Sequence, residues 1–199
     1  MQLYDEVYSF TKYKLLCIAG RAESEARAAL ANLRRGVGRR PGELPQLYGE
    51  LLQDMPEEMY SAGSKPSYAE WAVYMALTLY AMHQQGKDVK TDNMNRENVS
   101  LGNAASELVA DNDDTERIWK RLYAVASSDD MQEMSYHIRA LIKLLRDKDI
   151  PLDYPQLAKD LYLYQLSDES AEHIRLKWGQ DFYKKRTDEN KEDNNNEEN

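Results

Sequence analysis

The stretch SYAEWAVYMALTLYAMH, residues 67–83, decides the fold class of this chain. Its large apolar side chains recur every three or four residues, at Tyr68, Trp71, Met75, Leu79 and Met82. That spacing puts them on one face of a helix, since an α-helix repeats about every 3.6 residues. Ser67 precedes the run and Glu70 follows three residues later, which is the pattern of a capping box. The stretch therefore predicts an amphipathic helix that begins at about Ser67.

The same spacing recurs along the chain on both sides of this stretch. The further apolar stripes are Ala26, Ala29, Leu30 and Leu33; Leu44, Leu47, Tyr48, Leu51 and Leu52; Ile118, Leu122 and Val125; Ile138, Leu141, Ile142 and Leu145; Leu157, Leu161 and Tyr164; and Ile174, Trp178 and Phe182. No segment shows the convincing two-residue alternation of a half-buried strand. The sequence predicts an all-α fold.

Polar segments divide the helical stripes into two sets. The stretch QQGKDVKTDNMNRENVS, residues 84–100, is the best candidate for a linker, so we expect two small helical-bundle domains, 1–90 with a basic loop and 91–186. Residues 187–199, TDENKEDNNNEEN, contain no apolar side chain and carry a net charge of about −5, which predicts a disordered acidic tail. The chain as a whole has a net charge of −9.

Composition excludes several classes of protein. Of the 199 residues, 42% are hydrophobic and 31% charged, and no apolar run approaches the length of a membrane span, so no membrane contact is expected. The first residues, MQLYDEVYSF, lack the basic start and long apolar stretch of a signal peptide. The single cysteine, Cys17, cannot form an internal disulfide, and a buried small hydrophobe is its favoured interpretation. We expect a cytoplasmic protein.

Candidate catalytic and metal-binding groups are scattered. The three histidines, His83, His137 and His173, lie in three different predicted helices without a second ligand at metal spacing. No phosphate-binding or nucleophile motif is present. The sequence predicts no enzymatic activity, no metal and no cofactor.

Positive charge is concentrated in a way that the acidic total does not suggest. The segment NLRRGVGRRPGELP, residues 32–45, holds Arg34, Arg35, Arg39 and Arg40 around two glycines. A second basic group spans residues 173–186. A third group, Arg139, Lys143 and Arg146, has spacings of four and three residues and so shares one helix face. Each group alone is equally well explained as solvated surface. Together they favour contact with phosphates, which arginine binds well, and such contact would be largely independent of base sequence.

The order of motifs resembles the CasB family. The matching pieces are ARAALANLRRGVGRRPGELPQLY, AEWAVYMALTLYAMH, NVSLGNAASEL, DTERIWKRLYAVASSDDMQEMSYHIRALIKLLRDKDIPLDYPQLAKDL and IRLKWGQDFY. The resemblance extends over residues 26–183, which is most of the chain. The linker and the acidic tail are not recognised as features of that family.

The resemblance implies a non-catalytic small subunit of Cascade, the type I-E CRISPR surveillance complex. Its expected partners are the other Cascade subunits, a second copy of itself, the guide RNA and the target DNA. Its basic surface is expected to hold the guide–target region and the displaced strand, and so to stabilise the R-loop. By position, the resemblance implies nucleic-acid contacts for Arg34, Arg35, Arg39, Arg40, Arg121, Arg139, Lys143 and Arg146. The alternative is a purely structural scaffold whose arginines pair with acidic protein surfaces.

Overall fold

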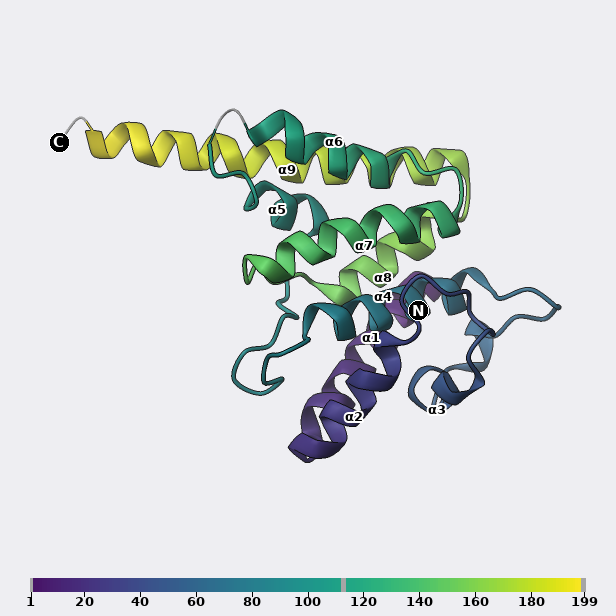
Figure 1. Cartoon of the computed structure of the whole chain (residues 1–199). Helices are drawn as coiled ribbons and strands as arrows, with labels where there is room; N and C mark the ends of the chain where they lie inside the picture. Colours follow the sequence, from purple (N-terminus) through teal and green to yellow (C-terminus); the bar gives the residue numbers. More distant parts are fainter. Residues whose placement is uncertain (1, 112–113, 198–199) are drawn as a thin grey trace.

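The computed structural model describes residues 2–111 and 114–197, with side chains as far as Lys184, and Figure 1 shows the whole chain. Its α-helices are α1 (Leu3–Gly20), α2 (Glu23–Arg34), α3 (Tyr48–Leu51), α4 (Tyr68–His83), α5 (Leu101–Ser106), α6 (Asp114–Ala126), α7 (Met131–Asp147), α8 (Tyr154–Tyr164) and α9 (Asp168–Glu197). Short 3₁₀ turns span Pro45–Leu47 and Glu57–Met59. Extended pairing in the described residues is confined to an isolated bridge between Asn95 and Leu152, so the all-α prediction is confirmed.

Local capping residues set the starts of several helices. The predicted capping box is present, because the Glu70 amide donates to Ser67 Oγ at 2.9 Å and the Ser67 amide donates to Glu70 Oε2 at 2.6 Å. Ser100 and Asn103 form a second capping box at the start of α5. Asp130 and Asp153 accept amide hydrogen bonds at the starts of α7 and α8, respectively. Side-chain oxygens thus satisfy amides that a helix leaves unpaired in its first turn.

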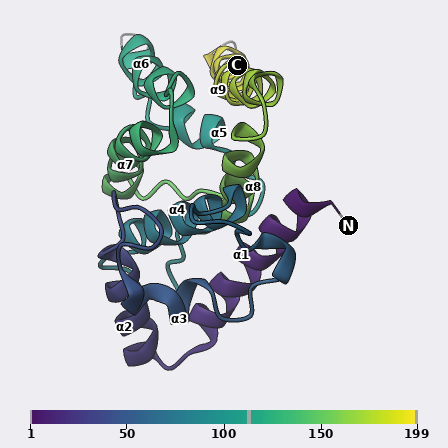
Figure 2. The same cartoon turned by 90° about the vertical axis from the view of Figure 1, so that its right-hand side faces the viewer.

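Helix α4 lies at the centre of the molecule (Figure 2), and it differs from the predicted amphipathic helix. Its buried residues run right round the helix and include Val73, Met75, Leu77 and Tyr80. It packs against α1, α2, α7 and α8. Every residue from 72 to 81 is buried, so this part of the helix has no solvated face, and a single apolar stripe underestimated its burial. The end of α4 therefore meets elements from both halves of the chain.

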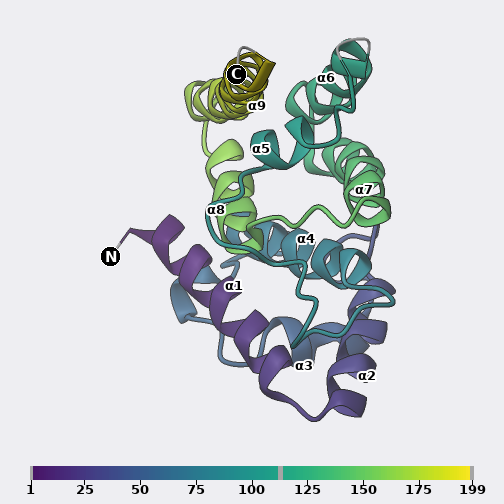
Figure 3. The ribbon, with the colours of Figure 1, turned by 90° about the vertical axis from the view of Figure 1, so that its left-hand side faces the viewer.

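The helices form two groups that share one core. Helices α1 to α3 lie on one side of α4 and α5 to α9 on the other (Figure 3). The buried hydrophobic cluster is continuous between the groups, mainly because α8 packs on both α1 and α4. In the described residues, no helix is long and apolar enough to cross a membrane. The division of the chain at residues 90/91 stays a prediction, as does the disordered tail at 187–199, whose side chains lie outside the described residues.

The predicted linker, residues 84–100, contains no helix, yet it is held in place by hydrogen bonds. The Gln84 side chain donates to Asp92 O at 2.8 Å and accepts from the Met94 amide at 2.9 Å. The Arg96 amide donates to Leu152 O at 3.1 Å, and the Leu152 amide donates to Met94 O at 3.0 Å. This segment is therefore tied to the turn that precedes α8, and it positions the end of α4 relative to the second group of helices.

Candidate nucleic-acid interface

Four of the eight predicted site residues line one groove. It lies where the ends of α2 and α4 meet the outer face of α7, and its volume is about 600 Å³. We call it the basic groove, and its lining residues are Arg34, Val37, Met82, Gln85, Tyr136, Arg139, Ala140, Lys143 and Arg146. None of these side chains is acidic. Segments about 100 residues apart in the chain thus bring four cations together.

Arg34 reaches the groove from the last residue of α2. Its Nη1 donates to the carbonyl of Ala81 in the last turn of α4, at 3.5 Å. A cation at this position offsets the partial negative charge at the carboxyl end of α4. Burial lowers the pKa of Arg34, although an arginine still carries its charge at neutral pH. Arg34 consequently has a structural role in addition to any ligand contact.

The three basic residues of α7 differ in how far they are engaged. Arg146 is half-buried and its Nη2 donates to Asp147 Oδ1 at 3.0 Å. Arg139 and Lys143 are exposed and form no ion pair within the described part of the chain. The apolar stripe of α7 is fully buried, these two side chains lie outside it, and a Cβ at Gly38 would lie 3.7 Å from Arg139 Nη1. Of the four cations in the groove lining, Arg139 and Lys143 are the ones most available to a ligand.

The arginines of the loop that follows α2 have different neighbours from Arg34. Arg35, Arg39 and Arg40 are exposed and are not part of the groove lining. Arg39 Nη1 lies 3.6 Å from Glu43 Oε2, and Arg40 Nε donates to Gln132 Oε1 at 3.3 Å. Arg39 is therefore engaged by a carboxylate of its own loop.

The glycines of this loop let it pack closely and turn. A Cβ at Gly36 would lie 2.8 Å from both Thr78 Cγ2 and the Tyr74 hydroxyl, so Gly36 lets the loop pack against α4. Gly38 has a φ of 77°, a left-handed conformation that favours glycine. Gln132 Nε2 donates to Gly38 O at 3.2 Å and fixes the turn against α7.

The remaining basic residues lie elsewhere. Arg121 is exposed on α6 and lies outside the basic groove. In the group at 173–186, Lys177 Nζ donates to the buried Asp160 at 2.8 Å, and Arg175 Nε donates to Ala126 O at 2.7 Å. Arg175 also lies over the Tyr164 ring. Two cations of this basic group therefore stabilise the packing of α9.

Sequence reasoning missed the uncharged part of the groove. Tyr136 lies three residues before Arg139 and seven before Lys143, so helical spacing alone could have placed it on the same face. Val37 and Met82 carry no such signal, because they come from a loop and from a different helix. Only the tertiary structure brings these two side chains to α7.

No catalytic arrangement stands out in the described residues. His83 ends α4, is fully buried, and its Nδ1 lies 2.8 Å from the Tyr154 hydroxyl. Burial, with the nearby charges of Lys87 and Arg146, lowers the pKa of His83 to about 4. Cys17 is partly buried beside Tyr13 on α1, so its expected full burial was wrong. Within residues 2–111 and 114–184, no three His, Cys, Asp or Glu side chains gather as metal ligands would.

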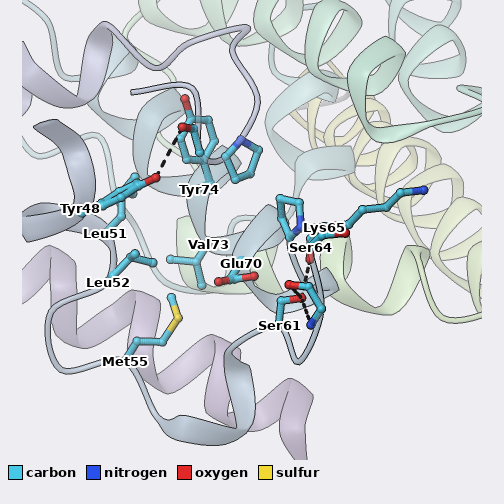
Figure 4. Close-up of a pocket in the computed structure, with 14 residues that line it drawn as sticks. Tyr48, Leu51, Leu52, Met55, Ser61, Ser64, Lys65, Glu70, Val73 and Tyr74 are labelled. Atoms are coloured by element: carbon cyan, nitrogen blue, oxygen red, sulfur yellow. Dashed lines mark hydrogen bonds between the residues drawn. The ribbon is translucent and has the colours of Figure 1, made fainter. Parts of the chain in front are cut away.

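A smaller cavity of about 290 Å³ lies between α3, α4 and the loop before α4, and it also lacks a catalytic arrangement (Figure 4). Its floor is apolar, with Leu51, Met55 and Val73. The carboxylate of Glu70 is used by the capping box, and Lys65 points away from the cavity. No acid and base face one another there, so it offers no evident chemistry.

Comparison with known proteins identifies the family. A family model described as CRISPR-associated protein Cse2 matches residues 29–183. The crystal structure of CasB from Thermobifida fusca is similar, with 31% sequence identity, a TM-score of 0.73, and coverage of 89% of this chain and 97% of that chain. No curated protein matches the chain.

Two more distant structures share the fold. A Cse2-family protein from Thermus thermophilus has 21% identity and a TM-score of 0.64, and the match covers 92% of this chain and 99% of that one. CasB from M. ruber has 22% identity and a TM-score of 0.66, with coverage of 91% and 96%, respectively. The family match extends over most of the chain and agrees with the structural likeness to the Thermobifida protein. This chain belongs to the Cse2 family of CRISPR-associated proteins, also called CasB.

Proposed function

We propose that this protein is a non-catalytic small subunit of a type I-E Cascade complex, and that its basic groove binds the sugar–phosphate backbone of nucleic acid. The guide–target region and the displaced DNA strand are its ligands, and their retention stabilises the R-loop during antiviral defence. The other subunits and a second copy of this chain are its protein partners. The observation that supports this proposal is the groove itself. Its lining contains Arg34, Arg139, Lys143 and Arg146 and no acidic side chain.

The physical argument concerns charge that the fold leaves unneutralised. A cation held beside a carboxylate gains little from a phosphate, whereas Arg139 and Lys143 have no such partner in the described residues. Formation of an R-loop exchanges one duplex for another of similar stability, so a few backbone contacts are enough to favour it. A net charge of −9 opposes long-range attraction, but a local cluster still binds a strand that the complex delivers.

The test is the salt dependence of binding by the full chain to a single-stranded DNA oligonucleotide. The variants are Arg139→Ala, Lys143→Ala and the double replacement, since Arg34 also supports α4. Each lost phosphate contact reduces the magnitude of the slope of log affinity against log salt by about 0.7. Affinity falls by similar factors for all base sequences, because phosphates carry no sequence information.

Lys65→Ala is the matched control for loss of one positive charge. Lys65 is exposed just before α4, whose 16 residues separate it from the groove by about 24 Å. This variant keeps the wild-type slope. If the double variant keeps the affinity and slope of the wild type, the groove does not bind phosphate.

A scaffold without nucleic-acid contact is the second candidate function, and one observation favours it. An apolar groove of about 870 Å³ lies between α6 and α9, with Trp119, Tyr123 and Leu176 in its lining. Tyr123 and Leu176 are 58% and 59% exposed, which suits a protein contact. Loss of assembly into the complex on Leu176→Ala, with DNA binding of the chain undetectable, would favour the scaffold.

A further inference from the structure

Tyr136 is an aromatic side chain that lies outside the hydrophobic core. At 72% exposure it is the most exposed large hydrophobic side chain among those described. Its ring meets the ring of its neighbour His137 edge-on, with centroids 5.2 Å apart and planes at 78°. A ring left this open to water adds little to folding, because its apolar area is not removed from solvent. Its face is available to a ligand.

The surroundings of Tyr136 combine two kinds of chemistry. Arg139 and Lys143 follow it by one and two helical turns on the same face of α7. Behind this row, Val37, Met82 and Ala140 make part of the groove lining apolar. A phosphate chain is held by the cations alone and gains nothing from an aromatic ring or an apolar lining. A nucleobase has a flat apolar face that fits both.

We infer that the basic groove binds an unpaired nucleotide, with its base stacked on Tyr136 while Arg139 and Lys143 hold the adjoining phosphates. The inference rests on the proposed function and specifies its ligand. Bases inside a duplex stack on one another, so their faces are closed to a side chain. Tyr136 consequently makes the groove prefer single strands, whereas the cations attract single strands and duplexes alike.

The experiment compares three probes of equal length, with the full chain at low salt. They are an oligothymidylate of about 12 nucleotides, an abasic strand with the same phosphates, and a duplex. Tyr136→Ala weakens binding of the oligothymidylate by about fivefold to a hundredfold, the range for loss of one base–aromatic stack. Binding of the abasic strand and of the duplex is unchanged, and so is the salt slope, since no charge is lost. Tyr136→Phe retains wild-type binding because it keeps the ring.

Tyr68→Ala is the matched control for removal of an exposed tyrosine. Tyr68 is 50% exposed but lines a cavity with Asp129 and Asp130, whose charges repel phosphate. Its replacement leaves binding of all three probes unchanged.

The outcomes separate this inference from the proposed function. If Tyr136→Ala binds oligothymidylate as well as the wild type does, there is no stack, although loss of affinity in Arg139→Ala would still support the phosphate site. An equal loss for the abasic strand also overturns the stack, since that strand has no base. If the wild-type chain binds none of the probes at low salt, both proposals fail.

Discussion

Replacing Gly102 by alanine tests how closely α5 and α9 approach each other. A Cβ at this position would lie 2.2 Å from the backbone oxygen of Trp178 and 2.9 Å from Asp181 Cβ. A carbon and a carbonyl oxygen without a covalent bond normally stay about 3.3 Å apart or more. The two helices would have to separate by about 1 Å, and a backbone carbonyl inside a helix cannot turn aside as a flexible side chain can.

Two opposing terms set the size of the effect. Alanine favours a helix over glycine by up to about 1 kcal/mol. Overpacking costs about 1–3 kcal/mol, and the upper half of that range applies because the obstacle is backbone. The free energy of unfolding should therefore fall by about 1–2 kcal/mol. For a chain of this size that lowers the melting temperature by about 2–8 °C.

Thermal melts followed by circular dichroism measure the change, with Gly179→Ala as the control. Gly179 is also a helical glycine, in α9, but its Cβ would meet only Trp119, at 3.5 Å, which is an ordinary contact. The same substitution there should keep the propensity gain and raise the melting temperature by about 2–4 °C. A Gly102→Ala variant that melts at or above the wild-type temperature would refute the close-packing argument.

Two further predictions concern buried polar groups. The pKa of His83 is lowered to about 4 in the folded protein, whereas in the unfolded chain it is about 6.5. The free energy of unfolding therefore keeps its full value above about pH 6.5 and falls as the pH falls below it, because the unfolded chain then binds a proton that the folded protein does not. Urea titrations measure the free energy of unfolding at about pH 7 and about pH 5. The loss between these two pH values should be about 2 kcal/mol greater in the wild type than in His83→Gln, and equal losses in the two proteins would contradict the prediction. Asp160 is buried and accepts from Trp178 Nε1 and Lys177 Nζ, both at 2.8 Å. Asp160→Ala should lower the free energy of unfolding by about 1–3 kcal/mol, measured in the same way, because the buried indole N–H loses its acceptor while the partly exposed Lys177 can turn to solvent. Asp160→Asn keeps an acceptor for the indole and should cost less than Asp160→Ala, and the reverse order would show that the indole hydrogen bond is unimportant.

The sequence by itself determined what depends on neighbours three or four residues apart. The stripe Ile138, Leu141, Ile142 and Leu145 predicted α7, and all four side chains are fully buried. Ser67 and Glu70 predicted the start of α4 to the residue. The spacing of Arg139, Lys143 and Arg146 predicted a basic face, because three positions on one helix keep their relation whatever the helix packs against. Fold class and this row of charges were therefore predictable.

Tertiary structure decided which charges remain free and which residues meet them. The ion pair between Arg39 and Glu43 joins residues only four apart, but nothing near Arg34 in the sequence shows that its side chain reaches the groove. Lys177 is neutralised by Asp160 of the preceding helix, a contact that its own helical spacing does not encode. The groove exists because α4 packs against both α2 and α7 and so brings Arg34 into one lining with the basic row of α7. Long-range packing of this kind depends on the sum of many apolar contacts between distant segments, and no single segment of the sequence contains that information.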